Sequence, residues 1–263
     1  MSGGVDKGSF GGIFVALGGI LLGLALEGGK IGQILQPTAA LIVFGGTLGA
    51  VMVQFPLPVV TAAFASLAQV FFENGEDPLV VVKEMVRYAQ KARKDGIISL
   101  DSEVTKVSDP FMKKTLMLAV DGTEPAELRK IMEVELENRG ERDENIPRVF
   151  ESAGGFSPTI GIIGAVLGLI QVMQHLDDIS EVGRGIAVAF VATIYGVGAA
   201  NLFFLPSAGK LKIRKREDQL RHEIILEGVT SILEGSNPRM VETKLLSFIS
   251  EARQNQNVQP AKR

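Results

Sequence analysis

Among the hydroxyl-bearing side chains inside the long uncharged stretches of this sequence, three stand out in the second half of the chain, where they could do chemistry that a surface residue does not. Thr159, Thr193 and Tyr195 fall within apolar runs, and Pro158 directly precedes the first of them. Hydroxyl groups at membrane depth can line the path of an ion, and a proline within a spanning helix can act as a hinge. Two structural alternatives stay open. A proline within five residues of a helix start is simply tolerated, and a threonine can bond to a backbone carbonyl one turn earlier.

The uncharged stretches lack any side chain that could hold a proton. They cover residues 8–26, 31–72, 152–174 and 185–209, and none of them contains Asp, Glu, Lys, Arg or His. Proton or sodium relays inside a membrane normally depend on an Asp or a Glu at depth. A channel or motor built on this chain must therefore take its titrating carboxylate from another polypeptide.

The other residue types do not suggest a catalytic site. The 263 residues include no Cys and only two His, so neither a thiolate metal site nor a catalytic zinc site is expected. The sequence contains no phosphate-binding Gly loop with its Lys, no Ser/His/Asp set and no acidic metal cluster. We therefore expect no enzyme and no cofactor. The net charge of −3 points to no nucleic-acid partner.

The elements that must position these residues are predicted to be four membrane helices in two hairpins. A hydrocarbon core of about 30 Å needs roughly 20 apolar residues per span. The mean hydropathy is +0.24 although 22% of the residues are charged, and the apolar residues are clustered along the chain. The first span is predicted to be retained and not to be a cleaved signal peptide, since a second apolar segment follows it almost at once. The predicted spans are about 11–26, 34–55, 154–174 and 185–206.

The distribution of basic residues predicts which segments face the cytoplasm. Of the 27 Lys and Arg residues, 13 lie in 56–150 and 11 in 207–263, whereas each hairpin loop holds one. The positive-inside rule then places both termini and the charged block in the cytoplasm. The predicted fold is an all-α membrane protein with four domains: an N-terminal transmembrane hairpin (1–55), a cytoplasmic helical domain (56–150), a C-terminal transmembrane hairpin (151–209) and a cytoplasmic basic tail (210–263).

Residues 57–72 are uncharged but follow Pro56 and contain Pro58. Because two prolines interrupt the helix ladder, an interfacial helix is preferred here, and a continuation of the second span stays open. The basic run 210–216 is interpreted as an anchor to anionic lipid. No segment of the charged block alternates at period two, so we expect no sheet there.

Apolar residues at helical spacing, together with helix-starting and helix-ending residues, predict four further helices outside the spans. They are expected from Pro78 to Gly96, from Pro110 to Val120, from Thr123 as N-cap, and from Asn237-Pro238 in the tail. The helix after Thr123 is expected to bury one face, consisting of Leu128, Ile131, Met132 and Leu136.

Glycines at small-xxx-small spacing predict close helix–helix packing, within one subunit or between subunits. By themselves they indicate association and no particular activity. The residues concerned are Gly19, Gly23, Gly45, Gly49, Gly161, Gly164 and Gly168.

The order of these segments resembles that of the flagellar stator subunit MotA, a family related to TolQ and ExbB. The stretch 36–50 resembles the second span of the family, 157–168 its third, and Thr193 with Pro206 its fourth. The resemblance implies that Pro158 and Pro206 couple ion passage to conformational change. It also implies that Thr193 faces a carboxylate of the partner, in an ion pathway that includes Thr159 and Tyr195. Ala165 falls where proton-driven members tend to carry Ala, so the implied ion is H⁺.

The same resemblance assigns a role to charged residues of the cytoplasmic block. Arg93 and Asp101 fall where the family carries the Arg and Glu that meet the rotor protein FliG, and Glu135 is a weaker match to a further acidic contact. Asp101 keeps the sign of the usual Glu but has a shorter reach. Without the resemblance, a solvated surface would be the default interpretation of Arg93 and Asp101.

The implied function is that of a stator subunit in the bacterial inner membrane. The family forms a ring, implied to be a pentamer, around a MotB dimer that supplies the ion-binding aspartate, and it turns inward proton flow into torque on the rotor. Two alternatives stay open. One is a TolQ- or ExbB-type energy transducer, which would have three spans, and the other is a non-conducting membrane scaffold.

Overall fold

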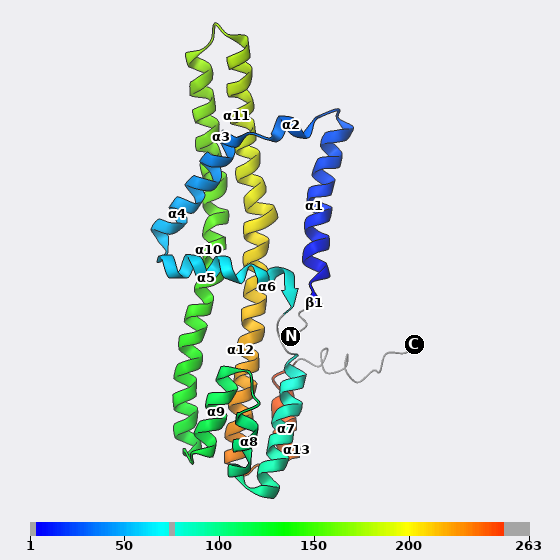
Figure 1. Cartoon of the computed structure of the whole chain (residues 1–263), viewed down its shortest axis with the longest axis vertical. Coiled ribbons are helices and arrows are strands. Elements are labelled where there is room, and N and C mark those ends of the chain that lie inside the picture. Colours follow the sequence, from blue (N-terminus) through cyan, green and yellow to red (C-terminus); the bar gives the residue numbers. More distant parts are fainter. Residues whose placement is uncertain (1–3, 74–76, 250–263) are drawn as a thin grey trace, which may run out of the picture. The chain divides into compact units, whose positions relative to one another are not determined.

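The computed structural model describes residues 4–73 and 77–249, and nearly all of this part of the chain is helical (Figure 1). Four of its helices are long and apolar enough to cross a membrane. The all-α fold expected from the sequence is therefore confirmed. The chain divides into two compact units, one made of Met1–Asn74 and Asp143–Ile213 and the other of Gly75–Arg142 and Arg214–Arg263.

The first unit begins with α1 (Lys7–Leu26), which starts four residues earlier than the predicted span. The reason is Asp6, whose carboxylate accepts a hydrogen bond from the backbone amide of Ser9 and thereby caps the helix. The glycines of α1 remain helical because a backbone in lipid must satisfy its own hydrogen bonds. No residue of α1 is buried within the described chain.

The second predicted span is divided into short segments. After α2 (Ile31–Ile34) the backbone is extended at Leu35 and Gln36, so that the continuous part begins only at Pro37. That part consists of α3 (Pro37–Ala40), the π-helix η1 (Leu41–Gly45) and α4 (Gly46–Gln54). It is three residues shorter at its start than the span expected from hydropathy.

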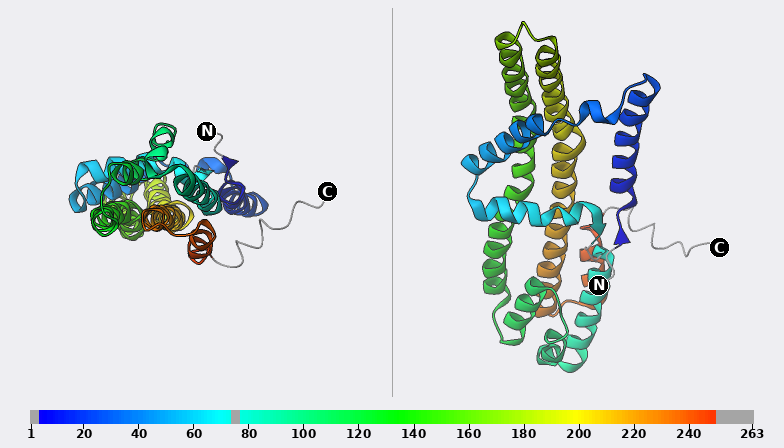
Figure 2. Two further views of the ribbon diagram at one scale, coloured as in Figure 1. Left: turned by 90° about the horizontal axis from the view of Figure 1, so that it is seen from below. Right: turned by 45° about the horizontal axis from the view of Figure 1, so that its top comes forward.

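Residues 57–71 form helices that are separate from the second span. Phe55 is extended, and α5 (Leu57–Ser66) and α6 (Ala68–Phe71) follow it. In Figure 1 and in the right-hand view of Figure 2, α5 runs across the direction of α10. The helix packs through Val60 and Ala63 against a cluster that includes Val149, Phe150 and Leu211. These residues therefore do not continue the second span, and their place at the membrane interface stays a prediction.

One small pairing of strands was not expected from the sequence. Gly4–Val5 (β1) and Phe72–Glu73 (β2) form an antiparallel ladder of two residue pairs. It ties the start of the chain to the end of α6.

The third and fourth predicted spans are parts of longer helices. Helix α10 runs from Pro125 to Gln174, and α11 covers Ile179–Gly198. The π-helix η3 (Ala199–Phe204) leads without a break into α12 (Leu205–Leu233). The boundary between the two units falls inside α10 and again inside α12.

The second unit packs these helix ends with short helices around one hydrophobic core. Asp77, Asp109 and Asn237 each cap a helix whose first residue is proline, which confirms the predicted starts of those helices. The elements are α7 (Pro78–Asp95), the 3₁₀-helix η2 (Ile97–Leu100), α8 (Asp101–Val104), α9 (Pro110–Val120) and α13 (Pro238–Leu246).

Two expectations for the start of α10 are wrong. Helix α10 begins at Pro125, so Glu124 and not Thr123 directly precedes it, and the amide of Thr123 donates to the carbonyl of Leu118 at the end of α9 at 3.1 Å. Leu128 and Met132 are fully buried as predicted, but Ile131 is 37% exposed. The apolar face of the helix is therefore narrower than its sequence pattern indicates.

An ion-pair network lies beside this core. The carboxylate of Glu227 pairs with Arg129 at 2.9 Å and with Lys244. Asp109 accepts hydrogen bonds from the amides of Phe111 and Met112, and its second carboxylate oxygen lies 3.7 Å from His222 Nε2.

Candidate functional site

Pro158 lies in the middle of a helix. Helix α10 begins 33 residues before it, so the interpretation as a proline tolerated near a helix start is wrong. A proline at this position donates no hydrogen bond to the carbonyl of Gly154 and crowds it. Next to it, the buried hydroxyl of Ser157 donates to the carbonyl of Gly196 on α11 at 2.8 Å. The weak point of α10 is therefore tied directly to α11.

Three glycines of α10 lie against α11 at very short range. A Cβ atom on Gly161 would lie 2.9 Å from the carbonyl oxygen of Ala192, and one on Gly168 would lie 2.7 Å from that of Gly185. A Cβ on Gly164 would lie 2.7 Å from the Ala192 side chain. No side chain fits at these positions, so the two helix backbones approach as closely as the glycines allow.

Two of the glycines that complete this contact were not singled out from the sequence. A Cβ on Gly196 would lie 2.6 Å from the carbonyl oxygen of Ser157, and one on Gly185 would lie 2.9 Å from that of Gly168. Their spacing of eleven residues is a helical repeat, and this signal could have revealed them. In contrast, the expected packing glycines of the first two spans lie in open space within this chain: Gly19, Gly23, Gly45 and Gly49.

The two threonines bond within their own helices. Thr193 is half-buried and donates to the carbonyl of Ala189 at 3.2 Å, and the exposed Thr159 donates to that of Phe156 at 2.8 Å. Thr193 belongs to the α10–α11 contact, because a Cβ on Gly161 would lie 3.5 Å from its Cα. Ala165 is half-buried on α10, one turn beyond Gly161. A bonded threonine hydroxyl keeps its two lone pairs as acceptors, so these bonds leave a role toward an ion possible.

Tyr195 joins α11 to the break at the start of the second span. Its hydroxyl donates to the carbonyl of Ile34 at 2.6 Å and accepts from the amide of Gln36 at 3.2 Å. Its ring stacks on Phe44 with centroids 6.0 Å apart. Backbone groups at membrane depth need a hydrogen-bond partner wherever the helix is interrupted. The hydroxyl of Tyr195 is the partner of two such groups.

Pro206 follows the π-helix η3 and lies away from this contact. The amide of Leu205 donates to the carbonyl of Ala200, five residues back, and this wider turn accommodates the proline that comes next. Pro206 is exposed and lines a cavity of about 360 Å³ together with residues of α1 and with Lys210. Pro158 and Thr193 do not line this cavity, so the prolines of the third and fourth spans border different spaces.

The charged residues of the second unit fall into two groups. Arg93 is exposed in the last turn of α7, and Asp101 is exposed at the first residue of α8. The bend between them needs Gly96, whose φ is +83°. Neither Arg93 nor Asp101 takes part in an ion pair in the described part of the chain, and both charges face solvent.

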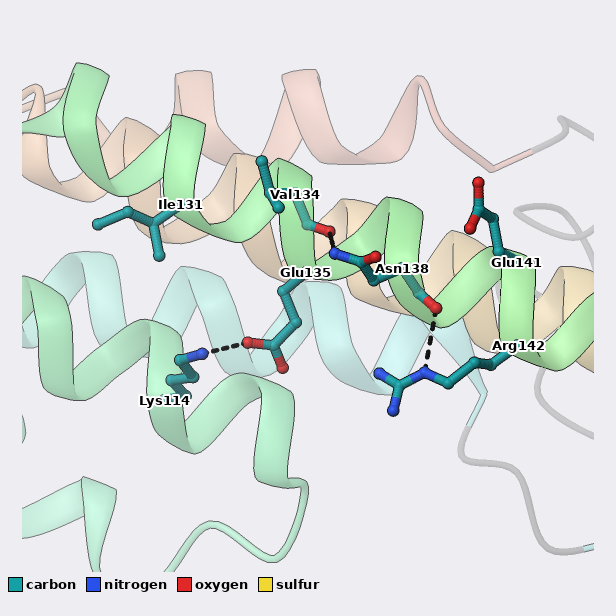
Figure 3. Close-up of a pocket in the computed structure, with 7 residues that line it drawn as sticks. All are labelled: Lys114, Ile131, Val134, Glu135, Asn138, Glu141 and Arg142. Carbon is teal, nitrogen blue, oxygen red and sulfur yellow. Dashed lines mark hydrogen bonds and ion pairs between the residues drawn. The ribbon is translucent and has the colours of Figure 1, made fainter. Parts of the chain in front are cut away.

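Glu135 is held in a different way. Its carboxylate pairs with Lys114 of α9 and lies 3.4 Å from Arg139 of its own helix. Figure 3 shows the side chains of Lys114 and Glu135 pointing toward each other, and both residues line a cavity of about 490 Å³. Its side chain is 19% exposed, so Glu135 is less available to a partner than Arg93 or Asp101.

Comparison with known proteins places the chain in a family. A model of the MotA/TolQ/ExbB proton channel family matches residues 103–224, and a model described as motility protein A N-terminal matches residues 10–96. Motility protein A of Bacillus subtilis (strain 168) is 34% identical over 249 residues, which cover 93% of this chain and 91% of the relative. This chain belongs to the MotA/TolQ/ExbB proton channel family.

Other members of the family support the same assignment. The chemotaxis protein PomA of Vibrio alginolyticus is 30% identical over 226 residues, 86% of this chain and 88% of the relative. The structure of C. jejuni MotAB matches with a TM-score of 0.87 and 31% identity, over 94% of this chain and 96% of that one. The flagellar MotAB stator complex of Bacillus subtilis matches with a TM-score of 0.85 and 33% identity, over 96% and 100%. The chain therefore shares the fold of these MotAB subunits, and four of its own helices are long and apolar enough to cross a membrane.

One membrane-proximal pair of this family member was missed by reasoning from sequence alone. Asp6 precedes the first span and Lys210 follows the fourth, and their side chains form an ion pair. Lys210 and Lys212 were interpreted as a lipid anchor, but Lys210 pairs with Asp6 and Lys212 with Glu151 at 2.5 Å. The charges of these two lysines are therefore partly neutralised by carboxylates of the same chain. No local pattern relates residues about 200 positions apart.

Proposed function

We propose that this chain is the ring-forming subunit of a flagellar stator that couples inward proton flow to torque. The observation that carries the proposal is the match, over nearly the whole chain, to subunits of MotAB complexes, combined with spans that hold no carboxylate. A MotB-type partner supplies the ion-binding aspartate. The complex lies in the bacterial inner membrane with both termini of this chain in the cytoplasm.

The α10–α11 hairpin is the part of this chain that faces the partner aspartate. Thr193 and Ala165 lie beside the glycine contact. The hydroxyl of Thr193 offers lone pairs to the partner aspartate, and the small side chain of Ala165 leaves space for it. Protonation of the aspartate removes its charge from the apolar surroundings, which changes its preferred position against the hairpin. Because the backbones of α10 and α11 are in close contact, the two helices respond as one body.

Movement of the hairpin reaches the cytoplasmic unit through continuous helices. Helices α10 and α12 carry residues of both units, and Pro158 and Pro206 interrupt their hydrogen-bond ladders within the first unit. Bending at these prolines changes the direction of the helix ends. The exposed charges of Arg93 and Asp101 then act on FliG, and this contact is sensitive to salt because both side chains are solvated.

Several copies of the chain form the ring, five by resemblance. The first span supports this proposal, since none of the residues of α1 is buried within the chain. Gly19 and Gly23 of α1 and Gly49 of α4 leave open space where a neighbouring helix can approach. Neighbouring subunits and lipid share this surface.

A complementation experiment tests the proposal. The chain and its MotB-type partner are expressed in a strain that has flagella but no stator. The wild-type pair restores swimming, whereas Thr193→Ile and Pro158→Leu leave cells flagellated and non-motile. Thr243→Ile is the matched control, since Thr243 is also a helical threonine bonded to a carbonyl four residues back, but lies exposed in α13. Normal swimming of both hairpin variants would refute the proposal.

The same strains separate the two alternatives. A TolQ- or ExbB-type transducer is disfavoured by the four membrane-spanning helices, because that arrangement has three. If the chain were such a transducer, it would give no torque, and it would restore the energy supply to the cell envelope in a strain that lacks one. A non-conducting scaffold predicts no proton leak when chain and partner are expressed together. The stator predicts a leak that disappears when either protein is expressed alone.

A further inference from the structure

Asp6 is a buried carboxylate at the point where three separate segments of the first unit meet. It is 5% exposed, and one of its oxygens caps α1 by accepting from the amide of Ser9 at 2.9 Å. Its other oxygen forms an ion pair with the ammonium group of Lys210 on α12. The hydrogen bond from Lys210, followed by that from Ser9, outweighs the effect of burial and lowers the pKa of Asp6 to about 2. The pair therefore stays ionised at any cellular pH.

Backbone and ring contacts fasten the same point to α6. The amide of Asp6 donates to the carbonyl of Phe71 at 2.9 Å, directly next to the β1–β2 ladder. The ring of Phe10 lies 5.3 Å from that of Phe71 and 6.4 Å from that of Phe72. The start of the chain is thus held by interactions of several independent kinds.

Within residues 4–73 and 77–249, the rest of α1 has no comparable attachment. No residue of the helix is buried, and a cavity of about 360 Å³ separates it from η3 and the start of α12. This cavity is lined on one side by small residues such as Gly8, Gly12 and Ala16, and on the other by Asn201 and Pro206. The helix is therefore anchored at its Asp6 end, and Lys210 is its ionic contact with α12.

The position of Lys210 links this anchor to the hinge of the fourth span. Lys210 follows Pro206 by four residues, one helical turn, so both side chains lie on the same face of α12 and line the same cavity. Any bending at Pro206 moves Lys210 and pulls on the buried carboxylate. Breaking the pair would take the ammonium group of Lys210 away from a buried carboxylate, which is unfavourable.

We propose that Asp6 and Lys210 are a positioning pair that makes the first span move together with the part of α12 beyond Pro206. This proposal rests on the proposed stator function. Without the pair, α12 can move into the cavity beside α1 when it bends at Pro206. The first hairpin then moves less than α12 does. The residues then contribute to torque without touching the transported ion.

The first test measures torque per stator unit. Units are induced stepwise in the stator-less strain, and the height of each speed step in tethered cells gives the torque of one unit. Asp6→Asn keeps a capping side chain but removes the charge, and Lys210→Met removes the charge at similar length. Both should lower the step height at least twofold without lowering the number of steps. Lys210→Arg, which keeps the charge, should stay near the wild-type value.

Lys212→Met is the matched control, because Lys212 carries the same charge two residues further along and pairs with the more exposed Glu151. It should leave the step height unchanged. A merely structural pair would reduce the number of steps or the amount of protein in the membrane and leave the step height intact. Wild-type step heights in Asp6→Asn and Lys210→Met would overturn the proposal.

The second test does not depend on torque, so it separates failure of this proposal from failure of the stator function. The chain has no Cys, which allows spin labels at Ile20→Cys on α1 and Ile213→Cys on α12, both exposed positions. Labelled chain is diluted into unlabelled chain, and the complex is measured by pulsed electron resonance. The distance distribution should be narrow with the intact pair and broad in Asp6→Asn. Identical distributions would overturn the proposal, even if the wild-type chain gave no torque.

Discussion

Replacing Gly161 by alanine places a methyl group between two helix backbones that are already in contact. The new Cβ would lie 2.9 Å from the carbonyl oxygen of Ala192, 3.2 Å from Cα of Gly196 and 3.5 Å from Cα of Thr193. Ordinary contact begins near 3.4 Å, so the first distance is about 0.5 Å too short. All three atoms belong to the backbone of α11 and cannot turn away, so the helices must separate.

The cost of this separation follows from the packing it disturbs. Overpacking of a close contact costs about 1–3 kcal/mol. The hydrogen bond from Ser157 to the carbonyl of Gly196 spans the same contact at 2.8 Å and would lengthen. Against this, a Gly→Ala change inside a helix contributes up to about 1 kcal/mol through propensity. Gly161→Ala should therefore be destabilising by roughly 1–2 kcal/mol overall, which is on the order of 2–8 °C in the melting temperature for a chain of this size.

Gly155→Ala is the matched control on the same helix. Gly155 is exposed, and a Cβ there meets no atom within 4 Å. This variant should be neutral or slightly stabilising. The assay is the thermal unfolding of the detergent-solubilised complex, combined with swimming in soft agar. If the two variants melted within 1 °C of each other and swam equally well, the backbone contact between α10 and α11 would not matter as argued.

Three further changes have defined outcomes. Tyr195→Phe removes the hydroxyl that serves the carbonyl of Ile34 and the amide of Gln36, so thermal stability should fall by about 1–3 kcal/mol, and an unchanged melting curve would contradict this. Glu227→Gln leaves Arg129 and Lys244, whose side chains are 36% and 49% exposed, without their carboxylate and should cost about 1–2 kcal/mol, whereas Glu223→Gln should be nearly neutral. Burial alone would raise the pKa of Asp109, but the His222 imidazole 3.7 Å away and hydrogen bonds from two backbone amides lower it to about 2. Its stabilising contribution is therefore complete above about pH 4 and is lost as the pH falls toward 2, so acid unfolding should begin at higher pH in Asp109→Asn.

Much of the fold could be predicted from local signals. The proline-started helices of the second unit begin at Pro78, Pro110 and Pro238 as predicted, because proline at the first turn of a helix is a signal that acts over a few residues. Ile131 shows where this reasoning ends. Its spacing matches that of its buried neighbours, but it lines an open cavity beside Lys114 of α9 and is 37% exposed.

The candidate site could be predicted only in part. The residue types were evident, since Thr193, Pro158 and the glycines stand out in an apolar background. Hydropathy could not indicate that α10 continues through Pro158, because the charged half of that helix resembles a separate soluble element. It also could not indicate that Tyr195 serves the backbone at Leu35, about 160 positions earlier in the chain.

The sequence by itself determined that this protein lies in a membrane and holds no carboxylate there, because both properties depend on composition along the chain. It also determined the family, since the order of spans and motifs is a property of the chain. The tertiary structure decided which residues act together. Whether Gly161 allows close approach, or Asp6 meets Lys210, depends on atoms from distant segments. Those contacts form only when the helices pack, because steric fit and the cost of a buried charge arise from neighbours in space.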